Sequence, residues 1–260
     1  MSETKLYLLD VEGTVAPVTL TSEVLFPYAR RHFEEFLREG LVREMENLKP
    51  GDSPEGMIML DVAELMREDQ AETDPDAPSI VPQEGAAISP ESAIPRMLAY
   101  VYWLMDRDRK STALKSLQGK IWKAGFESGE LKGTLFADVP EAFARWARDS
   151  RVAIYSSGSV EAQRLLFRYS NFGDLTPLIS GYFDTRTGAK RESASYAAIA
   201  GEMKVAPGEV LFFSDVVAEL DAAGRTGFGA GCGTRLVVRE GNAPVVNENG
   251  HKRIESFENL

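Results

Sequence analysis

Short, continuous apolar runs recur along the chain, and polar residues follow each of them at once. The runs occupy residues 6–9, 152–155, 210–213 and 235–238. A run of this length is typical of a strand that is covered on both faces, as in a parallel sheet. Helical segments follow the second and third runs, whereas residues 181–189 are turn-rich and the polar tail after Gly241 has no readable pattern. We therefore expect an α/β fold with a parallel sheet.

A different pattern fills the long interval between the first two runs. Apolar residues recur there at the helical period of about 3.6 residues, in the segments 25–37, 58–66, 94–105 and 114–121. We expect Thr21 or Ser22 to be the N-cap of the first of these helices and Gly40 to end it. Pro95 is expected in the first turn of the third helix, and Gly125 at the end of the fourth. We expect the second helix to end before the acidic stretch 68–76. From there to about Pro90, the polar residues are expected to form a long surface loop.

The helical interval looks like a domain of its own. We expect residues 20–133 to form an all-helical cap domain, inserted into a core made of residues 1–19 and 134–260. The core pattern resumes at Asp138, the expected N-cap of the helix before the run 152–155. An insertion immediately beyond the first strand can cover a site at the end of that strand and exclude water from it.

Composition and charge narrow the function classes. With 260 residues, 43% of them hydrophobic, the chain can bury a substantial core. Its 40 Asp and Glu residues outnumber 29 Lys and Arg, and the net charge of -11 argues against nucleic acid as a partner. The first apolar run is too short for a signal peptide, and no later run is long enough to span a bilayer. We therefore expect a cytoplasmic protein with no membrane partner.

Side chains for redox chemistry and for soft metals are few. Cys232 is the single cysteine, which excludes an internal disulfide. The two histidines, His32 and His251, lie in unrelated contexts, so zinc chemistry and a Ser-His-Asp triad are poorly supported. Any metal ion bound by this chain is therefore expected to be held by oxygen atoms.

Carboxylates directly follow two of the apolar runs. Asp10 and Glu12 follow the run 6–9, and Asp215 comes two residues after the run 210–213. Ligands of open α/β sheets bind outside the carboxyl ends of the strands, so we expect these acids to project into that crevice. Oxygen ligands from two adjacent strand ends, with room for water and a phosphate, suit Mg²⁺. The alternative is an acidic turn after a buried strand, since Asp and Gly favour turns for conformational reasons.

Two further features suggest that an anion binds at the same edge. The segment 156–159, Ser-Ser-Gly-Ser, separates the run 152–155 from a helix, where hydroxyls and N–H groups can bind a phosphate. Helix capping is the alternative role for these serines. It suits Ser159, whereas Ser156 and Ser157 precede the helix and are expected to face the crevice. Lys190 lies just ahead of another helix. Most lysines are solvated surface charges, but this position favours a role in the site.

Four elements in this order resemble the four motifs of the haloacid dehalogenase superfamily, namely Asp10-x-Glu12-Gly-Thr14, Ser156-Ser157, Lys190 and Ser214-Asp215. Within it, the chain is most similar to the enolase-phosphatases of methionine salvage, also called acireductone synthases. The phrases that carry this resemblance are Leu8–Thr14, Leu25–Tyr28, Leu114–Trp122, Tyr155–Gln163, Gly181–Thr185 and Phe213–Val216. They cover most of the chain, but not the acidic loop between about residues 70 and 90.

The resemblance implies a Rossmann-like three-layer core with a helical cap, acting on 5-(methylthio)-2,3-dioxopentyl phosphate. Members enolise this diketone phosphate and then remove its phosphate, which gives the acireductone 1,2-dihydroxy-5-(methylthio)pent-1-en-3-one. By the family pattern, Asp10, the main chain of Glu12 and Asp215 hold one Mg²⁺. Ser156, Ser157 and Lys190 bind the substrate, the small phosphorylated diketone. We expect the chain to act as a monomer.

The chemistry of these residues agrees with that assignment. Asp10 would attack phosphorus as the nucleophile, and Lys190 with the two serines would stabilise the transferring group. In most phosphatases of the superfamily the second acid is Asp, which acts as general acid and base. Here it is Glu12, and the sequence does not identify the base for enolisation. Two other interpretations stay open, a Mg²⁺-dependent phosphatase for another small phosphoester and a non-catalytic binding module of the same fold.

Overall fold

The chain folds into two compact units. Unit 1 comprises Met1–Val24 and Gly125–Leu260, and unit 2 comprises Leu25–Ala124. The computed structural model describes residues 3–47, 57–81, 90–228, 233–258 and 260, so Cys232 lies outside the described residues. In these parts of the chain, no helix has both the length and the apolar character needed to cross a bilayer.

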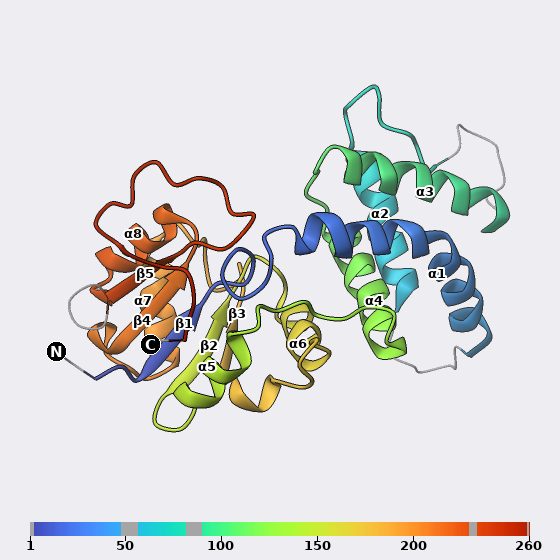
Figure 1. The fold of residues 1–260 in the computed structure, drawn as a ribbon. Helices are drawn as coiled ribbons and strands as arrows, with labels where there is room; N and C mark the ends of the chain where they lie inside the picture. The colour runs from blue at the N-terminus through green and yellow to red at the C-terminus, as the bar shows by residue number, and fades with distance from the viewer. Residues whose placement is uncertain (1–2, 48–56, 82–89, 229–232, 259) are drawn as a thin grey trace. The chain divides into compact units, whose positions relative to one another are not determined.

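Unit 1 contains a six-stranded sheet whose neighbouring strands are all parallel (Figure 1). The strands are β1 (Leu6–Leu9), β2 (Arg151–Tyr155), β3 (Gly181–Phe183), β4 (Val210–Ser214), β5 (Gly233–Val237) and β6 (Lys252–Ile254). Their order in space is β3-β2-β1-β4-β5-β6, so the first strand of the chain lies in the middle of the sheet. The predicted parallel sheet of an α/β core is confirmed.

Helices cover both faces of this sheet. They are α5 (Val139–Trp146), α6 (Val160–Arg168), α7 (Ser193–Glu202) and α8 (Val217–Arg225), with short 3₁₀ turns at Thr176–Leu178 and Pro207–Glu209. Leu6 and Leu8 of β1 pack in one buried cluster with residues of α7 and α8. Tyr7 stacks on Trp146 of α5, with ring centroids 4.3 Å apart. Because side chains of a strand alternate between its faces, α5 lies on the side opposite to α7 and α8, as a three-layer core requires.

The strand register brings the carboxyl ends of β1, β2 and β4 to one edge of the sheet. Leu9, at the end of β1, is paired with Ile154 of β2 and with Phe213 of β4. The N–H of Asp10 then donates to the Phe213 carbonyl at 2.9 Å. Side chains that directly follow these three strands therefore share the edge where ligands of such sheets bind.

Two of the six strands are not predicted from the sequence. Gly181–Phe183, at the start of the turn-rich segment, pairs with β2 as β3. Lys252–Ile254, in the tail without readable pattern, pairs with β5 as β6. Both lie at the edges of the sheet and have three residues each. An alternation of apolar and polar residues cannot be recognised over so short a segment.

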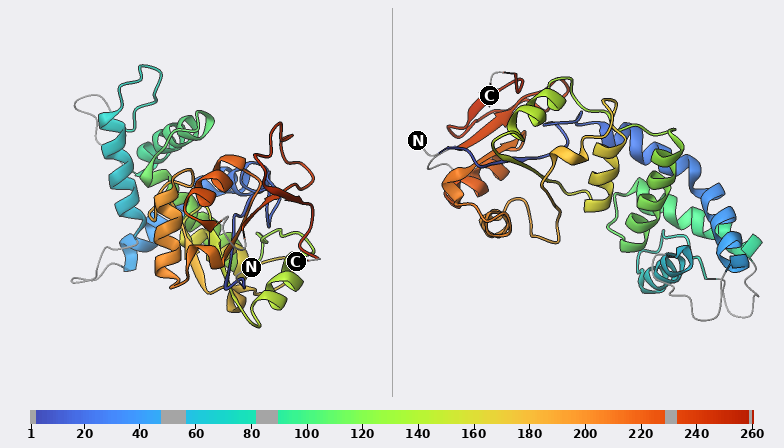
Figure 2. Two further views of the ribbon diagram at one scale, coloured as in Figure 1. Left: turned by 90° about the vertical axis from the view of Figure 1, so that its left-hand side faces the viewer. Right: turned by 90° about the horizontal axis from the view of Figure 1, so that it is seen from below.

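Unit 2 is built from helices. A π-helical turn at Leu20–Leu25 leads into α1 (Phe26–Asn47), and α2 (Ile58–Ala71), α3 (Pro90–Asp106) and α4 (Thr112–Ser128) follow. In Figure 2, α1 runs beside α2 and α3, and it contacts both. The four helices predicted from periodicity are therefore present. Several of their predicted ends are wrong, for reasons that lie in the packing.

The two glycines expected to end helices lie inside them instead. Gly40 is within α1, where an added Cβ would come within 2.3 Å of the Ile58 side chain, so glycine lets the two helices approach closely. Gly125 is within α4, which ends at Ser128. Gly129 follows with φ +83°, the left-handed conformation common just after a helix. From the sequence alone, a glycine that permits close helix packing thus looks the same as a glycine that ends a helix.

Two predicted helix starts are also wrong. Thr21 and Ser22 lie within the π-helical turn, so neither is the N-cap of α1. Pro95 lies inside α3 rather than in its first turn, because the helix begins at Pro90. Proline suits the first turn, where its missing N–H would have no partner in any case. The earlier proline therefore takes the position that the sequence analysis assigns to Pro95.

The acidic stretch after α2 is partly helical. α2 continues through the first acidic residues to Ala71, rather than ending before residue 68. The carboxylate of Asp69 is buried and accepts the N–H groups of Ile80 and Val81 at 3.0 and 3.2 Å. It thereby holds residues 72–81 against the helix, and Ile80 is fully buried. The remainder of the predicted loop, residues 82–89, lies outside the described residues.

Asp138 precedes α5 as predicted, but its side chain does not cap the helix. Its carboxylate accepts the N–H of Phe257 at 2.6 Å and pairs with the guanidinium of Arg239 at 2.9 Å. Both partners belong to the C-terminal part of the chain. Asp138 therefore ties that part to the core, a role that local sequence cannot indicate.

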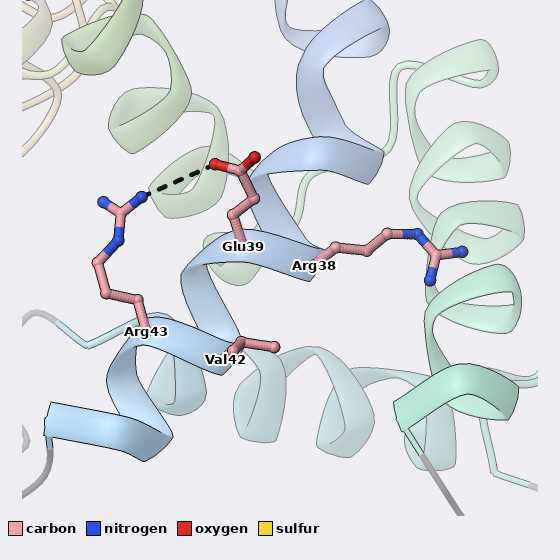
Figure 3. A pocket seen from close by; sticks show the side chains of 4 residues that line it. All are labelled: Arg38, Glu39, Val42 and Arg43. Carbon is pink, nitrogen blue, oxygen red and sulfur yellow. Dashed lines mark ion pairs between the residues drawn. The ribbon is translucent and has the colours of Figure 1, made fainter.

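Figure 3 shows a hollow on the surface of α1. It is lined by Arg38, Glu39, Val42 and Arg43, which all come from this one helix. Arg43 pairs with Glu39 at 3.7 Å, and both side chains are largely exposed. Exposed pairs at this helical spacing are weak and are screened by salt. We assign no function to this hollow, because it gathers no polar groups from other elements.

Candidate active site

A lysine and two buried acids meet at the carboxyl edge of the sheet. Lys190, in the loop before α7, places its Nζ 2.6 Å from Asp10 Oδ1 and 2.8 Å from Glu219 Oε2. Asp10 Oδ1 also accepts the N–H of Val11 at 2.7 Å, and the Ser214 hydroxyl donates to Glu219 at 2.9 Å. The structure thus brings the predicted Lys190 to the predicted Asp10. Charge-assisted hydrogen bonds of this kind fix both side chains in orientation.

Burial and neighbouring charges set the protonation of this cluster. Burial alone would lower the pKa of Lys190, but the charges of Asp10 and Glu219 outweigh it and raise that pKa. Burial and the charge of Asp10 raise the pKa of Glu219, while Lys190 acts in the opposite direction. The lysine is therefore a cation that balances two carboxylates, which would be costly to bury together without it.

Asp215, directly after β4, lies against the loop that follows β1 and carries Asp10 and Glu12. Burial, together with the charges of Asp10 and Glu219, raises the pKa of Asp215 to about 7. Its Oδ1 is buried and, among the described residues, has no hydrogen-bond partner. Its Oδ2 packs on Gly13, where an added Cβ would lie 2.3 Å away, and Gly13 has φ +71°. Only glycine fits this position, because the backbone is left-handed and the carboxylate occupies the side-chain space.

These two aspartates fit a divalent cation. A buried carboxylate oxygen without a partner is rare in folded proteins and asks for an explanation. A cation held by Asp10 and Asp215 would supply the missing partner and relieve the repulsion that raises the pKa of Asp215. In the described part of the chain, no three His, Cys, Asp or Glu side chains gather as a metal cluster. The predicted set does not require one, because it contains two carboxylates and a main-chain oxygen of Glu12.

Aromatic and small residues hold the loop that carries Lys190. The Tyr196 hydroxyl donates to the Lys190 carbonyl at 2.6 Å, and the Tyr155 hydroxyl donates to the Gly188 carbonyl at 2.9 Å. The Ser195 hydroxyl donates to the carbonyl of Ala189 at 2.8 Å. Burial raises the pKa of Tyr155 above its usual range. The two tyrosines thus remain protonated donors at neutral pH and keep the lysine loop in place.

The serine loop after β2 is also supported from the neighbouring strand. Ser156 is buried, and its hydroxyl accepts the N–H of Gly158 at 3.2 Å, whereas Ser157 is exposed. Ser159 caps α6 through the N–H of Ala162 at 3.3 Å, as the sequence analysis allows. The side-chain amide of Gln163 donates to the carbonyls of Gly158 and Phe183 at 2.8 and 2.9 Å. The loop is therefore pre-formed at the N-terminus of a helix, which is suited to an anion.

Asp184, directly after β3, connects this helix to the lysine loop. Its buried carboxylate accepts the N–H of Val160, the first residue of α6, at 3.2 Å. It also pairs with the Arg186 guanidinium at 3.0 Å. Burial alone would raise the pKa of Asp184, but hydrogen bonds from Arg186 and Val160 outweigh it and lower that pKa. Asp184 thus acts as an ionised support for the serine loop.

We expect Asp184→Asn to lower the free energy of unfolding by about 1–3 kcal/mol at pH 7, because N–H donors lose a charged acceptor. A lowered carboxyl pKa contributes stability above the unfolded-state pKa, and that contribution is lost as pH falls. The difference between the two proteins should therefore shrink below about pH 4. Urea unfolding of both proteins at pH 7 and below about pH 4 measures this difference in stability. Asp174→Asn is the matched control and should show a smaller effect, because Asp174 lies in an exposed turn and its carboxylate accepts from the nearby Thr176.

Glu12 and Thr14 complete the loop after β1. Glu12 Oε1 accepts the N–H of Thr21 at 3.0 Å, so this carboxylate is bound at the start of the π-helical turn. Thr14 is fully buried, and its hydroxyl lacks a hydrogen-bond partner within the described residues. Unlike Asp10, Glu12 makes no ion pair with Lys190 among the pairs of the described residues. The two acids of this loop therefore face different partners.

Three residues that support the site have no role predicted from the sequence. Glu219 lies in the first turn of α8, four residues after Asp215, and this spacing next to a strand-end acid is a signal that could have identified it. Gln163 and Asp184 have no comparable signal. Their partners lie on different elements, so only the pairing of β2 with β3 reveals what they hold.

Comparison with known proteins agrees with this geometry. A family model described as haloacid dehalogenase-like hydrolase matches residues 4–227. The enolase-phosphatase E1 of Synechococcus elongatus is 51% identical over 242 residues, which are 92% of this chain and 90% of that protein. The enolase-phosphatase E1 of Leptospira borgpetersenii is 40% identical over 257 residues, 98% of each chain. The crystal structure of the UTR4 protein of Saccharomyces cerevisiae matches with a TM-score of 0.71 and 35% identity, over 99% of this chain and 100% of that one.

Proposed function

The chain belongs to the enolase-phosphatases of the haloacid dehalogenase-like hydrolase family, and from this premise we propose which substrate it takes and how its residues act. The resemblance stated from the motifs is thereby confirmed. The substrate is 5-(methylthio)-2,3-dioxopentyl phosphate, which is enolised and then dephosphorylated to the acireductone. This reaction belongs to methionine salvage.

The observation that supports the proposal most directly is the set of contacts that Asp10 makes. This carboxylate lies at a strand end and is held through Oδ1 by Lys190 at 2.6 Å and by the Val11 N–H at 2.7 Å, and Asp215 packs on Gly13 of the same loop. An acid with only a conformational role in a turn would not need a lysine 2.6 Å away. A non-catalytic binding module would not need a carboxylate held in place as a nucleophile either.

Phosphoryl transfer starts with attack on phosphorus by Asp10, and we assign Oδ2 to it because Oδ1 is already held. The bond from phosphorus to the substrate oxygen breaks as the bond to Asp10 forms, and Glu12, as general acid, gives the leaving oxygen its proton. Glu12 then takes a proton from the water that attacks the aspartyl-phosphate, which releases inorganic phosphate and restores Asp10. Lys190, Ser156 and Ser157 stabilise the charge on the transferring group. Lys190 is thus both a catalytic and a substrate-binding residue in this proposal.

One Mg²⁺ ion per chain would be held by Asp10, Asp215 and the main-chain oxygen of Glu12. It would neutralise carboxylate and phosphate charge together, and it would polarise the substrate carbonyl. The unpaired Oδ1 of Asp215 supports this assignment. The helical unit would act as the cap that excludes water from the site. The monomeric state and the cytoplasmic location stay predictions.

Two measurements together test the function. Phosphate release is followed across a panel of phosphoesters that includes the diketone phosphate, with and without Mg²⁺. The proposal expects Mg²⁺-dependent release with a strong preference for the diketone phosphate, together with formation of the enol. Equal rates on simple phosphoesters would instead favour a phosphatase of the same fold with another substrate.

Glu12→Asp tests whether this acid is also the enolisation base. A Glu carboxylate reaches one methylene further than Asp, so it could meet both the leaving oxygen and the proton on the adjacent substrate carbon. We expect the variant to hydrolyse a non-enolisable phosphoester within about an order of magnitude of the wild-type rate, but to lose enolisation much more severely, because a base out of hydrogen-bond reach fails. Stopped-flow absorbance of the enol, beside phosphate release, separates the two steps.

The opposite outcome would exclude Glu12 as that base. If the variant slows both steps equally, or slows hydrolysis alone, another group takes the proton. Glu23→Asp is a suitable control, since Glu23 is an exposed acid close to Thr21, the partner of Glu12. It should leave both steps at the wild-type rate.

A further inference from the structure

The segment that follows β5 lies against the loop that carries Asp10. The N–H of Asn242 donates to the Arg239 carbonyl at 3.2 Å and closes a four-residue turn, in which Gly241 has φ +88°. This turn directs two side chains to the same loop. Asn242 Nδ2 donates to the carbonyl of Gly13 at 2.9 Å, and Arg239 Nε donates to the carbonyl of Thr14 at 3.1 Å.

Gly13 is held between two side chains. A Cβ added to it would lie 2.3 Å from Asp215 Oδ2 and 3.1 Å from Asn242 Oδ1, so the two residues pack against the same point of the loop. The amide orientation of Asn242 is set by its Nδ2, which donates to Gly13 and also to the carbonyl of Val237 at 3.4 Å. Because Gly13 is left-handed, its peptide needs such external support to stay in one orientation.

Arg239 extends this support to two other parts of unit 1, the segments 136–138 and 255–257. Its side chain is nearly buried and pairs with Asp138 at 2.9 Å, and its Nη1 donates to the Glu255 carbonyl at 2.8 Å. Its guanidinium lies 4.5 Å from the ring centre of Phe136 and 4.7 Å from that of Phe257. A group held on so many sides offers the Thr14 carbonyl a fixed donor rather than a mobile one.

We propose that Asn242, supported by Arg239, is a positioning residue that fixes the main chain between Asp10 and Thr14 for metal binding and phosphoryl transfer. The loop contributes the nucleophile and the proposed main-chain ligand at Glu12, so a shift of Gly13 displaces both. This inference rests on the proposed Mg²⁺ site. It makes the C-terminal segment, which shows no readable pattern in the sequence, a part of the active centre.

The test uses Asn242→Ala in the full chain. We expect the dissociation constant for Mg²⁺, measured by calorimetry without substrate, to rise about 10-fold or more, as is typical when the support of a metal ligand is lost. The value of kcat should fall by a similar factor while KM changes little, since Asn242 does not contact the phosphate-binding serines. Asn247→Ala is the control, because Asn247 is exposed, lies in the same segment and accepts the N–H of Asn249. It should leave both values unchanged.

Arg239→Lys gives a second variant. It keeps a cation beside Asp138 but cannot bond the carbonyls of Thr14 and Glu255 together, so it should weaken Mg²⁺ binding in the same direction. Thermal unfolding of both variants without metal measures their folding stability separately from Mg²⁺ binding. Wild-type Mg²⁺ affinity and kcat in both variants, whatever their Tm, would overturn the inference while leaving the proposed function intact. A wild-type protein without Mg²⁺-dependent turnover would overturn the proposed function, and the inference with it.

Discussion

Asp10→Asn should reduce phosphate release by roughly 10⁴-fold or more, the scale seen when a nucleophile is removed and the rest of a site remains. An amide oxygen is too weak a nucleophile to form the phosphoryl intermediate. The substitution keeps shape and an acceptor for Lys190, so folding should persist. Phosphate release is measured with Mg²⁺ and the diketone phosphate. Wild-type protein quenched during turnover should carry one added phosphoryl group by mass spectrometry, and the variant none.

The control for Asp10→Asn makes the same chemical change elsewhere. Asp149 is an exposed residue of unit 1, and Asp149→Asn should release phosphate at the wild-type rate. Circular dichroism and thermal unfolding establish that both variants are folded. Substantial turnover by a verified, folded Asp10→Asn protein would show that another group attacks phosphorus, and the assignment would be wrong.

The sequence predicts the centre of the sheet better than its edges. β1, β2 and β4 contain apolar runs, because neighbouring strands pair with both of their edges and helices cover the faces of the sheet. Those three strands carry Asp10, the serine loop and Asp215, so most predicted site residues fall on the part of the fold that local pattern defines; Lys190, which follows β3, is the exception. β3 and β6 are short edge strands whose pairing partners, not their own residues, decide their structure.

Two supporting residues of the site cannot be predicted from the sequence, for a similar reason. Asp184 and Asn242 act on groups that lie 24 and 229 residues away along the chain. Asp and Asn are common in turns and at helix termini, so the residue type alone suggests a local structural role. Predicted helix ends are wrong for a related reason. Gly40 is of the residue type that often ends a helix, but here it allows a close contact with Ile58. In both cases tertiary contacts override the local signal.

Lys190→Ala should slow turnover by at least about 10²-fold, the scale of losing one donor that stabilises a developing charge. It should also lower the free energy of unfolding by about 3–5 kcal/mol, because Asp10 and Glu219 lose the cation that balances them. The raised pKa of Lys190 means that its stabilising contribution is complete below its unfolded pKa, and therefore at the neutral pH of the assay. Urea unfolding and steady-state kinetics measure the two effects.

Separating these two effects needs a second substitution. Arg191→Ala, at the exposed neighbour of Lys190, should change neither stability nor rate appreciably. In the double variant Lys190→Ala and Glu219→Gln, one of the two unbalanced carboxylates becomes neutral, so part of the lost stability should return. Turnover should not return, because no cation faces the transferring phosphoryl group. If the double variant regained both stability and rate, Lys190 would act only by balancing buried charge, and the phosphate contact assigned to it would be wrong.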